Sequence, residues 1–289
     1  MAKYIRALKF LLLIAVVAVG LGYAGSSHSL VAFDWPIFAL CMGLAFVVQW
    51  LMFIPAYIWQ TERYFDLTGS LTYISVTLLA VFLAAKEDMR SIVLTAMVLI
   101  WALRLGSFLF TRILQDGSDH RFDQIKPNAP RFFVVWTLQG LWVSFTAAAA
   151  LAAISSDKVL ELQLWDGFAI ALWVLGFAFE AISDRQKRVF RADPANKGRY
   201  INTGLWAYSR HPNYFGEICL WIGVAILAVP VLQSWQYATL LSPVFVILLL
   251  TRISGIPGLE AGADKRWGEE AEYQAYKQNT PVLIPKLKH

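Results

Sequence analysis

The sequence predicts an all-α, polytopic membrane protein with about seven or eight transmembrane helices and a short cytoplasmic amphipathic segment at its C-terminus. Of its 289 residues, 58% are hydrophobic and only 16% are charged, whereas a soluble domain carries roughly a quarter charged residues. The apolar residues fall in long runs, as membrane-spanning helices require. The 12 Trp, 11 Tyr and 19 Phe residues suit interfacial aromatic belts and packed helices.

Eight apolar segments approach the ~20 residues that a helix needs to cross the hydrocarbon core. In chain order they are roughly residues 7–24, 35–59, 69–85, 91–113, 132–155, 165–183, 214–232 and 236–256. Lys3, Arg6 and Lys9 precede the first segment as they would in a signal peptide, but no convincing cleavage site follows. We therefore predict a first transmembrane helix, with a cleaved signal peptide as the alternative.

Lys and Arg residues in the loops predict the orientation, because cytoplasmic loops are enriched in them. The basic segments are residues 112–131, 185–210 and the tail, and the segments without Lys or Arg are residues 25–34 and 233–235. Alternation of eight spans then places both termini in the cytoplasm, with a bacterial inner membrane as the expected location. Lys86 and Arg90 fall in a loop assigned to the outside, and they weaken this pattern slightly.

The chain shows neither an internal repeat nor a low-complexity linker, so we expect one integral membrane domain over residues 1–289. Within it, the helices of residues 7–113 are the predicted substrate side and residues 132–289 are the predicted cofactor-binding half. Cys41 and Cys219 lie in apolar segments, which disfavours a disulfide framework or a thiolate metal site. Four scattered His residues argue against a His-based metal site. The net charge of +5 indicates basic loops rather than nucleic-acid binding.

Polar, ionisable and aromatic side chains are densest where a basic loop meets an apolar helix, in residues 203–217 (TGLWAYSRHPNYFGE). Pro212 suits the first turn of that helix, where its missing N–H is not needed. Arg210 and His211 then lie at the helix N-terminus, where free N–H groups and the helix dipole favour an anion. Asn213 and Glu217 are four apart and share one face. The arrangement suits a cofactor that carries phosphate or adenine.

The preceding helix carries a second polar feature, a stripe of charged side chains. Glu180, Asp184, Arg188 and Arg191 come at i, i+4, i+8 and i+11, so they share one helical face. One interpretation is a charge-paired helix end with side chains that snorkel to the interface. The other is a functional site, because ionisable residues at membrane depth are site candidates by default.

Residues 203–217 resemble the signature of the steroid 5-alpha-reductase C-terminal superfamily, and most closely its bacterial DUF1295-type branch of uncharacterised membrane proteins. Its members include steroid and sterol reductases that use NADPH. A more distant set, the isoprenylcysteine carboxyl methyltransferases, has a related Arg-His-Pro run and uses S-adenosylmethionine. The resemblance is strong over residues 173–285 and weaker over residues 59–112. Because no GxGxxG motif follows a predicted strand and opens a helix, as dinucleotide binding by such a motif requires, the cofactor site must be built from helices.

The stripe and the resemblance together define a predicted NADPH site. Its residues are Asp184, Arg188, Arg191, Tyr200, Asn202, Arg210, His211, Asn213, Tyr214, Glu217, Glu260, Tyr273 and Tyr276. The resemblance implies that Asp184 and Arg191 line this site, and that Asn213 and Glu217 contact the nicotinamide and its carboxamide. For His211 the alternative is a purely structural hydrogen bond.

The resemblance also implies two segments that fold over the bound cofactor, a loop and the C-terminal tail. Tyr200 and Asn202 belong to a loop that folds over the pyrophosphate, although ordinary turn residues would give the same pattern. The tail around Glu260, Tyr273 and Tyr276 would form a lid over the diphosphate and adenine, and an amphipathic surface helix is the alternative. Either Arg199 or Arg210 would pair with a 2′-phosphate in a bidentate manner.

The predicted substrate side lies at the end of the second span and along the fourth. Its candidate catalytic residues are Glu62, Tyr64, Asp66 and Arg104. An arginine within a span is costly unless it is paired, so we expect Arg104 to pair with Glu62 or Asp66, either for structure or for catalysis. The resemblance implies a glutamate and a tyrosine that hold the substrate carbonyl. Glu62 roughly matches the first, and Trp101 stands near the expected tyrosine, so Tyr64 or Tyr57 becomes the candidate proton donor.

The resulting hypothesis is an NADPH-dependent reductase of a carbon–carbon double bond in a lipid such as a steroid enone. The lipid would enter sideways from the bilayer, the cofactor would enter from the cytoplasm, and a monomer would suffice. The competing hypotheses are a membrane methyltransferase that uses S-adenosylmethionine and a lipid-binding protein without enzymatic activity.

Overall fold

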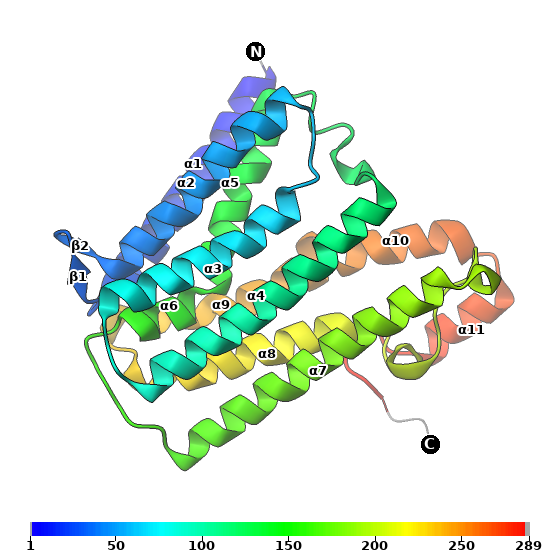
Figure 1. The fold of residues 1–289 in the computed structure, drawn as a ribbon. Helices are drawn as coiled ribbons and strands as arrows, with labels where there is room; N and C mark the ends of the chain where they lie inside the picture. Colours follow the sequence, from blue (N-terminus) through cyan, green and yellow to red (C-terminus); the bar gives the residue numbers. More distant parts are fainter. Residues whose placement is uncertain (1, 287–289) are drawn as a thin grey trace. The chain divides into compact units, whose positions relative to one another are not determined.

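The computed structural model describes residues 2–286, with side chains from residue 4 onward, and its elements are almost all helical (Figure 1). Contacts divide the chain into two compact units. Unit 1 comprises residues 1–163 and 227–242, and unit 2 comprises residues 164–226 and 243–289. Seven helices of the described residues are long and apolar enough to cross a membrane, or eight if one bent pair counts as a span. The predicted fold class, an all-α polytopic membrane protein, is confirmed.

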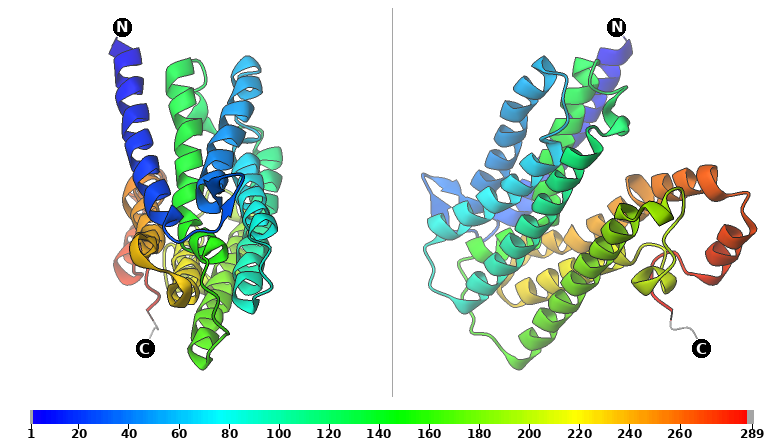
Figure 2. Two further views of the ribbon diagram at one scale, coloured as in Figure 1. Left: turned by 90° about the vertical axis from the view of Figure 1, so that its left-hand side faces the viewer. Right: turned by 45° about the vertical axis from the view of Figure 1, so that its right-hand side comes forward.

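Unit 1 is a helical bundle. Its helices are α1 (Ala2–Ser26), α2 (Ile37–Ile58), α3 (Phe65–Ala84), α4 (Met89–Asp116), α5 (Ala129–Thr146) and α6 (Ala148–Ser155), and its shorter elements are strands β1 (Val31–Ala32) and β2 (Trp35–Pro36) and 3₁₀ turns η1 (His120–Phe122), η4 (Val229–Val231) and η5 (Ser234–Leu240). Helices α1, α2 and α5 lie side by side, and α3 contacts both α2 and α4 (Figures 1 and 2). The two strands pair antiparallel, with Val31 opposite Pro36.

Hydrogen bonds gather the loops of unit 1 at two ends. At one end, the Leu30 N–H donates to the Ser155 carbonyl at 2.7 Å, and the Lys86 ammonium donates to the Ser156 carbonyl at 2.8 Å. At the other end, Glu62 pairs with Lys126. The α5–α6 pair begins just after Lys126 and ends at Ser155, so it runs from one end to the other. A single interrupted span would take this path, and counting the pair as one span would bring the number of crossings to eight.

The interruption between α5 and α6 is a 57° bend at Ala147. A break in a helix frees backbone carbonyls, and inside a membrane each of them needs a new donor. The Thr146 carbonyl finds one in the Ser242 hydroxyl, at 2.6 Å. Every side chain from Ala148 to Ser155 is buried, because small residues let neighbouring backbones approach closely in a membrane bundle.

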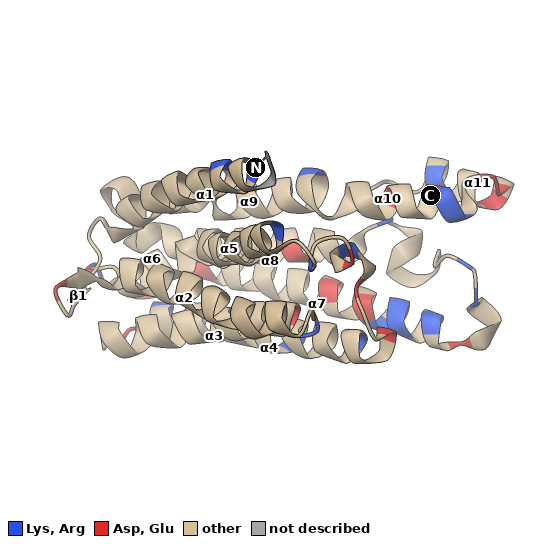
Figure 3. Ribbon diagram, turned by 90° about the horizontal axis from the view of Figure 1, so that it is seen from above, with Lys and Arg blue, Asp and Glu red and all other residues tan. Residues whose placement is uncertain are grey.

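Unit 2 holds two long helices and a shorter C-terminal pair. Its elements are α7 (Leu164–Ala192), η2 (Pro194–Asn196), η3 (Gly204–Ala207), α8 (Pro212–Ala228), α9 (Leu241–Leu248), the π-helical turn η6 (Leu249–Ile253), α10 (Ile256–Trp267) and α11 (Ala271–Asn279), although the last two residues of α8 and the first two of α9 belong to unit 1. In Figure 3 the charged positions of unit 2 gather on the later turns of α7 and on α10 and α11.

Helices α7 and α8 touch backbone to backbone through glycines. A Cβ atom added at Gly216 would lie 2.5 Å from both the Glu180 nitrogen and the Gly176 oxygen. One added at Gly223 would lie 2.8 Å from the Ala169 oxygen. Because membrane helices associate mainly through close packing, these glycines fix the register of α7 against α8. They thereby place the polar later turns of α7 beside the start of α8.

All eight predicted apolar segments correspond to helical segments of the structure. Most boundaries differ from the prediction by a few residues, and two segments differ more. The fifth segment is broken at Ala147, and the sixth continues as helix to Ala192, beyond the predicted end at residue 183. The extension follows from the stripe on α7, whose charged residues keep a helical spacing past the apolar run.

Candidate functional site

The candidate site is a groove in unit 2, formed by the last turns of α7, the loop before α8, and helices α10 and α11. The groove is lined by Lys187, Phe190, Arg191, Arg199, Tyr200, Ile201, Trp206, Arg210, His211, Gly258, Leu259, Glu260, Gly262, Ala263, Arg266, Trp267, Tyr273 and Tyr276. Its empty volume is ≈ 870 Å³, part of which is open to solvent. Cationic side chains and aromatic rings thus share one concave surface, a combination that suits an anionic ligand with flat rings.

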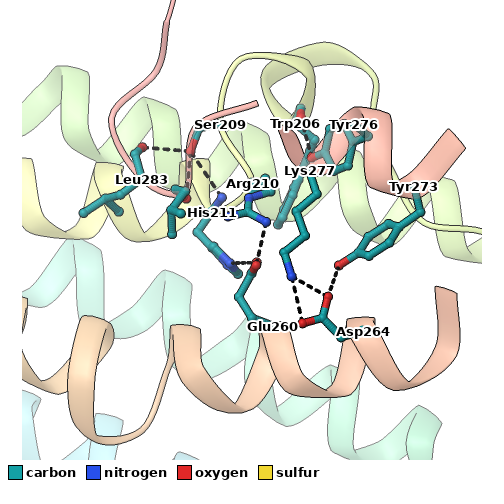
Figure 4. A network of polar contacts seen from close by, with 11 residues as sticks. Trp206, Ser209, Arg210, His211, Glu260, Asp264, Tyr273, Tyr276, Lys277 and Leu283 are labelled. Atoms are coloured by element: carbon teal, nitrogen blue, oxygen red, sulfur yellow. Dashed lines mark hydrogen bonds and ion pairs between the residues drawn. The ribbon is translucent and has the colours of Figure 1, made fainter. Parts of the chain in front are cut away.

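At one side of the groove, Glu260 on α10 joins the two residues that precede α8 (Figure 4). The Arg210 Nη1 atom lies 2.7 Å from Glu260 Oε2 as an ion pair, and the His211 Nε2 atom lies 2.8 Å from Glu260 Oε1. The His211 ring also stacks on Tyr214, with 5.7 Å between centroids. Glu260 therefore offsets the charge of Arg210 and fixes the orientation of the imidazole.

Burial lowers the pKa of His211 below its ordinary value, although the hydrogen bond to Glu260 acts in the opposite direction. Its Nδ1 atom is buried and has no hydrogen-bond partner among the described residues. If Nε2–H donates to the Glu260 carboxylate, Nδ1 is an open acceptor at the groove wall. A neutral His211 with a free acceptor can receive a hydrogen bond from a ligand.

The C-terminal segment ties down the loop that carries this motif. The Ser209 hydroxyl donates to the Leu283 carbonyl at 2.7 Å, and the Arg210 N–H donates to the Pro281 carbonyl at 2.9 Å. From α11, the Tyr276 hydroxyl donates to the Trp206 carbonyl at 2.7 Å. The tail predicted as a lid is therefore hydrogen-bonded to the signature stretch.

Aromatic rings form the outer wall of the groove. Tyr200 stacks on Tyr276 with 5.4 Å between centroids, and it meets Tyr273 at 5.1 Å and Trp267 at 5.7 Å in edge-to-face geometry. Desolvation raises the pKa of Tyr273 to about 12 and also raises that of Tyr276. Both phenols are therefore neutral at physiological pH and add no charge to the groove.

Deeper along α7 and α8, Asn213 donates through Nδ2 to Asp184 Oδ1 at 3.2 Å. Its own carbonyl oxygen is buried without a hydrogen-bond partner in the described part of the chain. A buried amide oxygen without a donor carries an energetic cost, so a donor from a ligand would be favourable here.

Seven of the thirteen predicted cofactor residues line the groove. They are Arg191, Tyr200, Arg210, His211, Glu260, Tyr273 and Tyr276. Asp184 and Asn213 contact each other, and Tyr214 contacts His211. Two of the others, Arg188 and Asn202, are exposed and are not among the residues that line the groove.

The helical spacing of α7 explains why Arg188 is off the groove. At ~100° per residue, Lys187 and Arg191 lie within ~40° of each other, whereas Arg188 is turned ~100° from Lys187. The sequence reasoning chose Arg188 and missed Lys187, whose ammonium lies 4.5 Å from the ring centroid of Trp206. It also missed Gly258 and Gly262, whose four-residue spacing exposes a small-residue face of α10 to the groove.

On the predicted substrate side, the expected pairing of Arg104 is wrong. Glu62 accepts from the Asp119 N–H at 2.7 Å and pairs with Lys126, while Asp66 lies 3.7 Å from Arg112. The Glu62 contacts join the α2–α3 loop to the α4–α5 segment of unit 1, and the Asp66 contact joins α3 to α4. Glu62 is 5% exposed and both its oxygens are engaged, which is the geometry of a structural ion pair.

The other substrate-side candidates lie beside aromatic rings. Tyr64 is 43% exposed and stacks on Phe110, and Arg104 lies 5.6 Å from the ring centroid of Phe108. Among the described residues, no group of three or more His, Cys, Asp or Glu side chains is placed to hold a metal ion.

These features define an all-α polytopic membrane protein whose C-terminal half carries a groove of cations and aromatic rings. The model of the protein family of unknown function DUF1295 matches residues 52–280, and the chain belongs to that family. No solved structure gives a significant match to the chain.

Curated relatives extend the comparison beyond the family. The chain is 24% identical over 274 residues to 3-oxo-5-alpha-steroid 4-dehydrogenase 1 of Rattus norvegicus, covering 92% of this chain and 88% of the relative. It is 23% identical over 228 residues to an uncharacterized protein of Schizosaccharomyces pombe, covering 68% of this chain and 64% of that protein. A 74-residue stretch is 30% identical to a probable O-methyltransferase of Ustilaginoidea virens, covering 26% of this chain and 25% of that protein. The resemblance to the steroid 5-alpha-reductase superfamily is confirmed.

Proposed function

We propose that the protein is an NADPH-dependent reductase of a carbon–carbon double bond in a membrane-soluble lipid, a 3-oxo-4-ene steroid or a related enone. The observation that carries this proposal is the groove of unit 2, where arginines and aromatic rings line one concave surface. The similarity to a steroid dehydrogenase over 92% of the chain supports the reaction type.

The residues present fit the cofactor. NADPH carries a diphosphate, a 2′-phosphate and two flat rings, and the groove offers Arg191, Arg199 and Arg266 beside the rings of Tyr200 and Tyr276. Arginine suits phosphate because its planar fork donates two parallel hydrogen bonds. In this proposal the arginines hold the phosphates, and the tyrosines cover the adenine.

The inner residues suit the other end of the cofactor. Asn213 has a buried amide oxygen with no donor, and His211 has a buried nitrogen with none. In this proposal the Asn213 oxygen accepts a hydrogen bond from the carboxamide of the nicotinamide. Asp184 lies behind Asn213, and Glu217 lies one turn further along α8. Asp184 fixes the Asn213 amide by accepting from its Nδ2 atom, so the free oxygen keeps one orientation.

When bound, NADPH supplies a hydride to the β-carbon of the enone. The protein must then stabilise the charge that develops on the carbonyl oxygen and exclude water. We assign the carbonyl contact to the Tyr64 hydroxyl, which makes no hydrogen bond among the described residues. In this scheme Glu62 and Asp66, through their pairs with Lys126 and Arg112, hold the loop that carries Tyr64, and Arg104 belongs to the same substrate side.

The proposed setting is a bacterial inner membrane with both termini in the cytoplasm. The lipid substrate enters from the bilayer and the cofactor enters from the cytoplasm, across the basic loop between α7 and α8. The basic loops support this orientation, and so does a count of eight crossings when the bent α5–α6 pair is taken as one span. The structure also accounts for the exception, because Lys86 and Arg90 donate to backbone carbonyls inside unit 1.

The test is ligand binding to the detergent-purified protein, with thermal stabilisation as the readout. NADPH, NADH and S-adenosylmethionine are titrated separately. We expect NADPH at about 100 times its dissociation constant to stabilise the fold by about 2.7 kcal/mol. Substitution Arg191→Ala should weaken NADPH binding about tenfold through loss of a charge-assisted hydrogen bond, whereas Arg188→Ala, on the same helix but off the groove, should leave it unchanged.

Binding is followed by turnover with a panel of enone lipids, measured as loss of reduced-nicotinamide absorbance and gain of saturated product. Folded protein that is stabilised by neither dinucleotide would exclude the proposal. Equal effects of Arg191→Ala and Arg188→Ala would show that the groove is not the binding site.

A methyltransferase is the second candidate function, supported by the short match to a probable O-methyltransferase. It predicts stabilisation by S-adenosylmethionine and not by NADPH. It places no requirement on Tyr64, so Tyr64→Phe would leave methyl transfer intact, whereas it should lower enone reduction.

A further inference from the structure

A second, smaller pocket opens beside the groove at the end of α7. It is lined by Arg191, Asn196, Lys197, Gly198, Arg199, Arg266, Trp267 and Glu270. Arg191, Arg199, Arg266 and Trp267 belong to both walls, so this side pocket is continuous with the groove. The Trp267 indole N–H donates to the Gly198 carbonyl at 2.6 Å, which fixes the loop against α10 and gives the side pocket a defined edge.

The side pocket and the groove differ in whether their cationic side chains form ion pairs with acidic residues. In the groove, Arg210 is only 10% exposed and forms an ion pair with Glu260. In the side pocket, Lys197, Arg199 and Arg266 make no ion pair within the described residues, and Glu270 is the single acid among the lining residues. The Glu270 side chain itself makes no hydrogen bond in the described chain, and it does not cap α11. The side pocket therefore has an excess of positive charge.

We propose that the side pocket is a subsite for a phosphate monoester dianion, the 2′-phosphate that distinguishes NADPH from NADH. This inference rests on the proposed function and adds the basis of cofactor choice. Of the two arginines that could pair with the 2′-phosphate, it selects Arg199, because Arg210 already forms an ion pair with Glu260. Arg199 and Arg266 present guanidinium groups for paired hydrogen bonds, and Lys197 adds a point charge.

The position of the aromatic wall supports the same assignment. Tyr200 and Trp267 lie 5.7 Å apart between centroids, and Trp267 lines both cavities. An adenine covered by Tyr200 in the groove would carry its ribose at this border. The phosphate on that ribose would then reach the side pocket, while the diphosphate stays in the groove.

A phosphate dianion has a second possible source, the headgroup of an anionic membrane lipid. The experiment therefore has two arms, both on full-length protein in detergent free of phospholipid. The first arm measures dissociation constants for NADPH, NADH and the fragments 2′,5′-ADP and 5′-ADP by calorimetry. The second adds short-chain phosphatidic acid as a competitor and measures its own binding.

Four charge-removing variants separate the side pocket from the general surface charge. Lys197→Gln and Glu270→Gln change residues that line the side pocket but not the groove. Lys265→Gln and Glu269→Gln are their charge-matched controls, since both residues are exposed, adjoin the lining residues Arg266 and Glu270 in sequence, and line neither cavity. Glu270→Gln is the most telling variant, because a folding defect cannot make binding tighter.

We expect Lys197→Gln to weaken NADPH and 2′,5′-ADP about fivefold and Glu270→Gln to tighten them about threefold, the range of exposed charge pairs. NADH and 5′-ADP should change less than about twofold, as should all four ligands in the control variants. Raising the salt concentration should reduce the preference for NADPH over NADH, because exposed charges are screened.

Equal shifts for NADPH and NADH in Lys197→Gln would overturn the subsite and leave the proposed reductase standing. A phosphatidic acid affinity that follows the four variants, while the NADPH to NADH ratio does not, would assign the side pocket to lipid and overturn it likewise. Failure of both dinucleotides to bind the unmodified protein would overturn the proposed function and this subsite together.

Discussion

Arg90 in unit 1 and Arg199 in unit 2 are the same side chain in opposite surroundings. Arg90 is 1% exposed and donates to the carbonyls of Leu227 at 2.8 Å and Glu161 at 3.1 Å. Arg199 is exposed, lines a groove, and makes no ion pair in the part of the chain that the structure describes. The first arginine completes the hydrogen bonding of the backbone, and the second offers its donors to a ligand.

The same contrast extends to the lysines. Lys86 donates to two backbone carbonyls of unit 1, at 3.3 and 2.8 Å, and desolvation lowers its pKa. Lys197 makes no side-chain contact of this kind among the described residues and faces the side pocket. The sequence cannot separate the two types, since both occur in short polar loops next to apolar helices. A cation whose N–H groups donate to backbone carbonyls contributes to stability, whereas a cation whose N–H groups are not used within the protein is available for binding.

Removing the buried arginine gives the largest expected effect. Arg90→Met leaves the carbonyls of Leu227 and Glu161 without their donor, and each buried unsatisfied group costs roughly 1–3 kcal/mol. We expect a loss of about 3 kcal/mol of stability, seen as a lower thermal midpoint in detergent, with dinucleotide affinity of the folded protein unchanged. Arg131→Met, an exposed arginine at the start of α5, is the control and should change neither quantity. If Arg90→Met instead weakened binding and kept stability, the contrast between the two arginines would be refuted.

The elements of the fold were predictable because span length and apolar composition leave few alternatives in a membrane. All eight apolar segments form helices. The bend at Ala147 was not predictable, since no Pro or Gly marks it and residues 147–150 are four alanines in sequence. The donor that satisfies the Thr146 carbonyl, Ser242, lies almost 100 residues away.

The site was only partly predictable, because local motifs can be found in the sequence whereas their distant partners cannot. The motif from Arg210 to Glu217 and the tail with Glu260 carry local signals, and the structure joins them through Glu260. Glu62 pairs with Lys126 rather than Arg104 because the α4–α5 segment, which has no helical periodicity, folds back onto the α2–α3 loop. Partners that come from irregular segments leave no pattern to find in the sequence.

The second prediction concerns the seam between α7 and α8, the line of close backbone contact at Gly216 and Gly223. It compares how closely helices approach each other in the two units. In unit 1, a Cβ added at Gly106 would meet the Ser70 side chain, whereas one at Gly216 in unit 2 would meet backbone atoms of Glu180 and Gly176 at 2.5 Å. Side chains can rotate away but backbones cannot, so Gly216→Ala should cost about 2 kcal/mol and weaken dinucleotide binding, because α7 carries Arg191.

The control for this seam lies on α7, the helix that packs against Gly216. Gly167 has no atom within 4 Å of an added Cβ, so Gly167→Ala should be neutral or stabilise α7 slightly through higher helix propensity. Thermal midpoints and NADPH affinities of both variants in detergent provide the measurement. Equal stability of the two alanine variants would mean that the close approach of α7 and α8 does not organise the groove.

Acidification gives the smallest expected effect and tests whether His211, at the inner end of the groove, is neutral in the folded protein. Burial holds the pKa of His211 below the ~6.5 of an unfolded histidine, so below that pH the unfolded state binds a proton that the folded state does not. Stability should therefore fall as the pH drops below about 6.5, by at most about 1.4 kcal/mol per pH unit for one proton. His211→Asn should flatten this fall, whereas His120→Asn, at an exposed site, should not. Thermal midpoints recorded from neutral to mildly acidic pH provide the measurement. A fall that is equally steep in the His211 variant would show that the acid sensitivity arises from groups other than this imidazole, around which Lys187, Arg210 and Glu260 are the nearby charges.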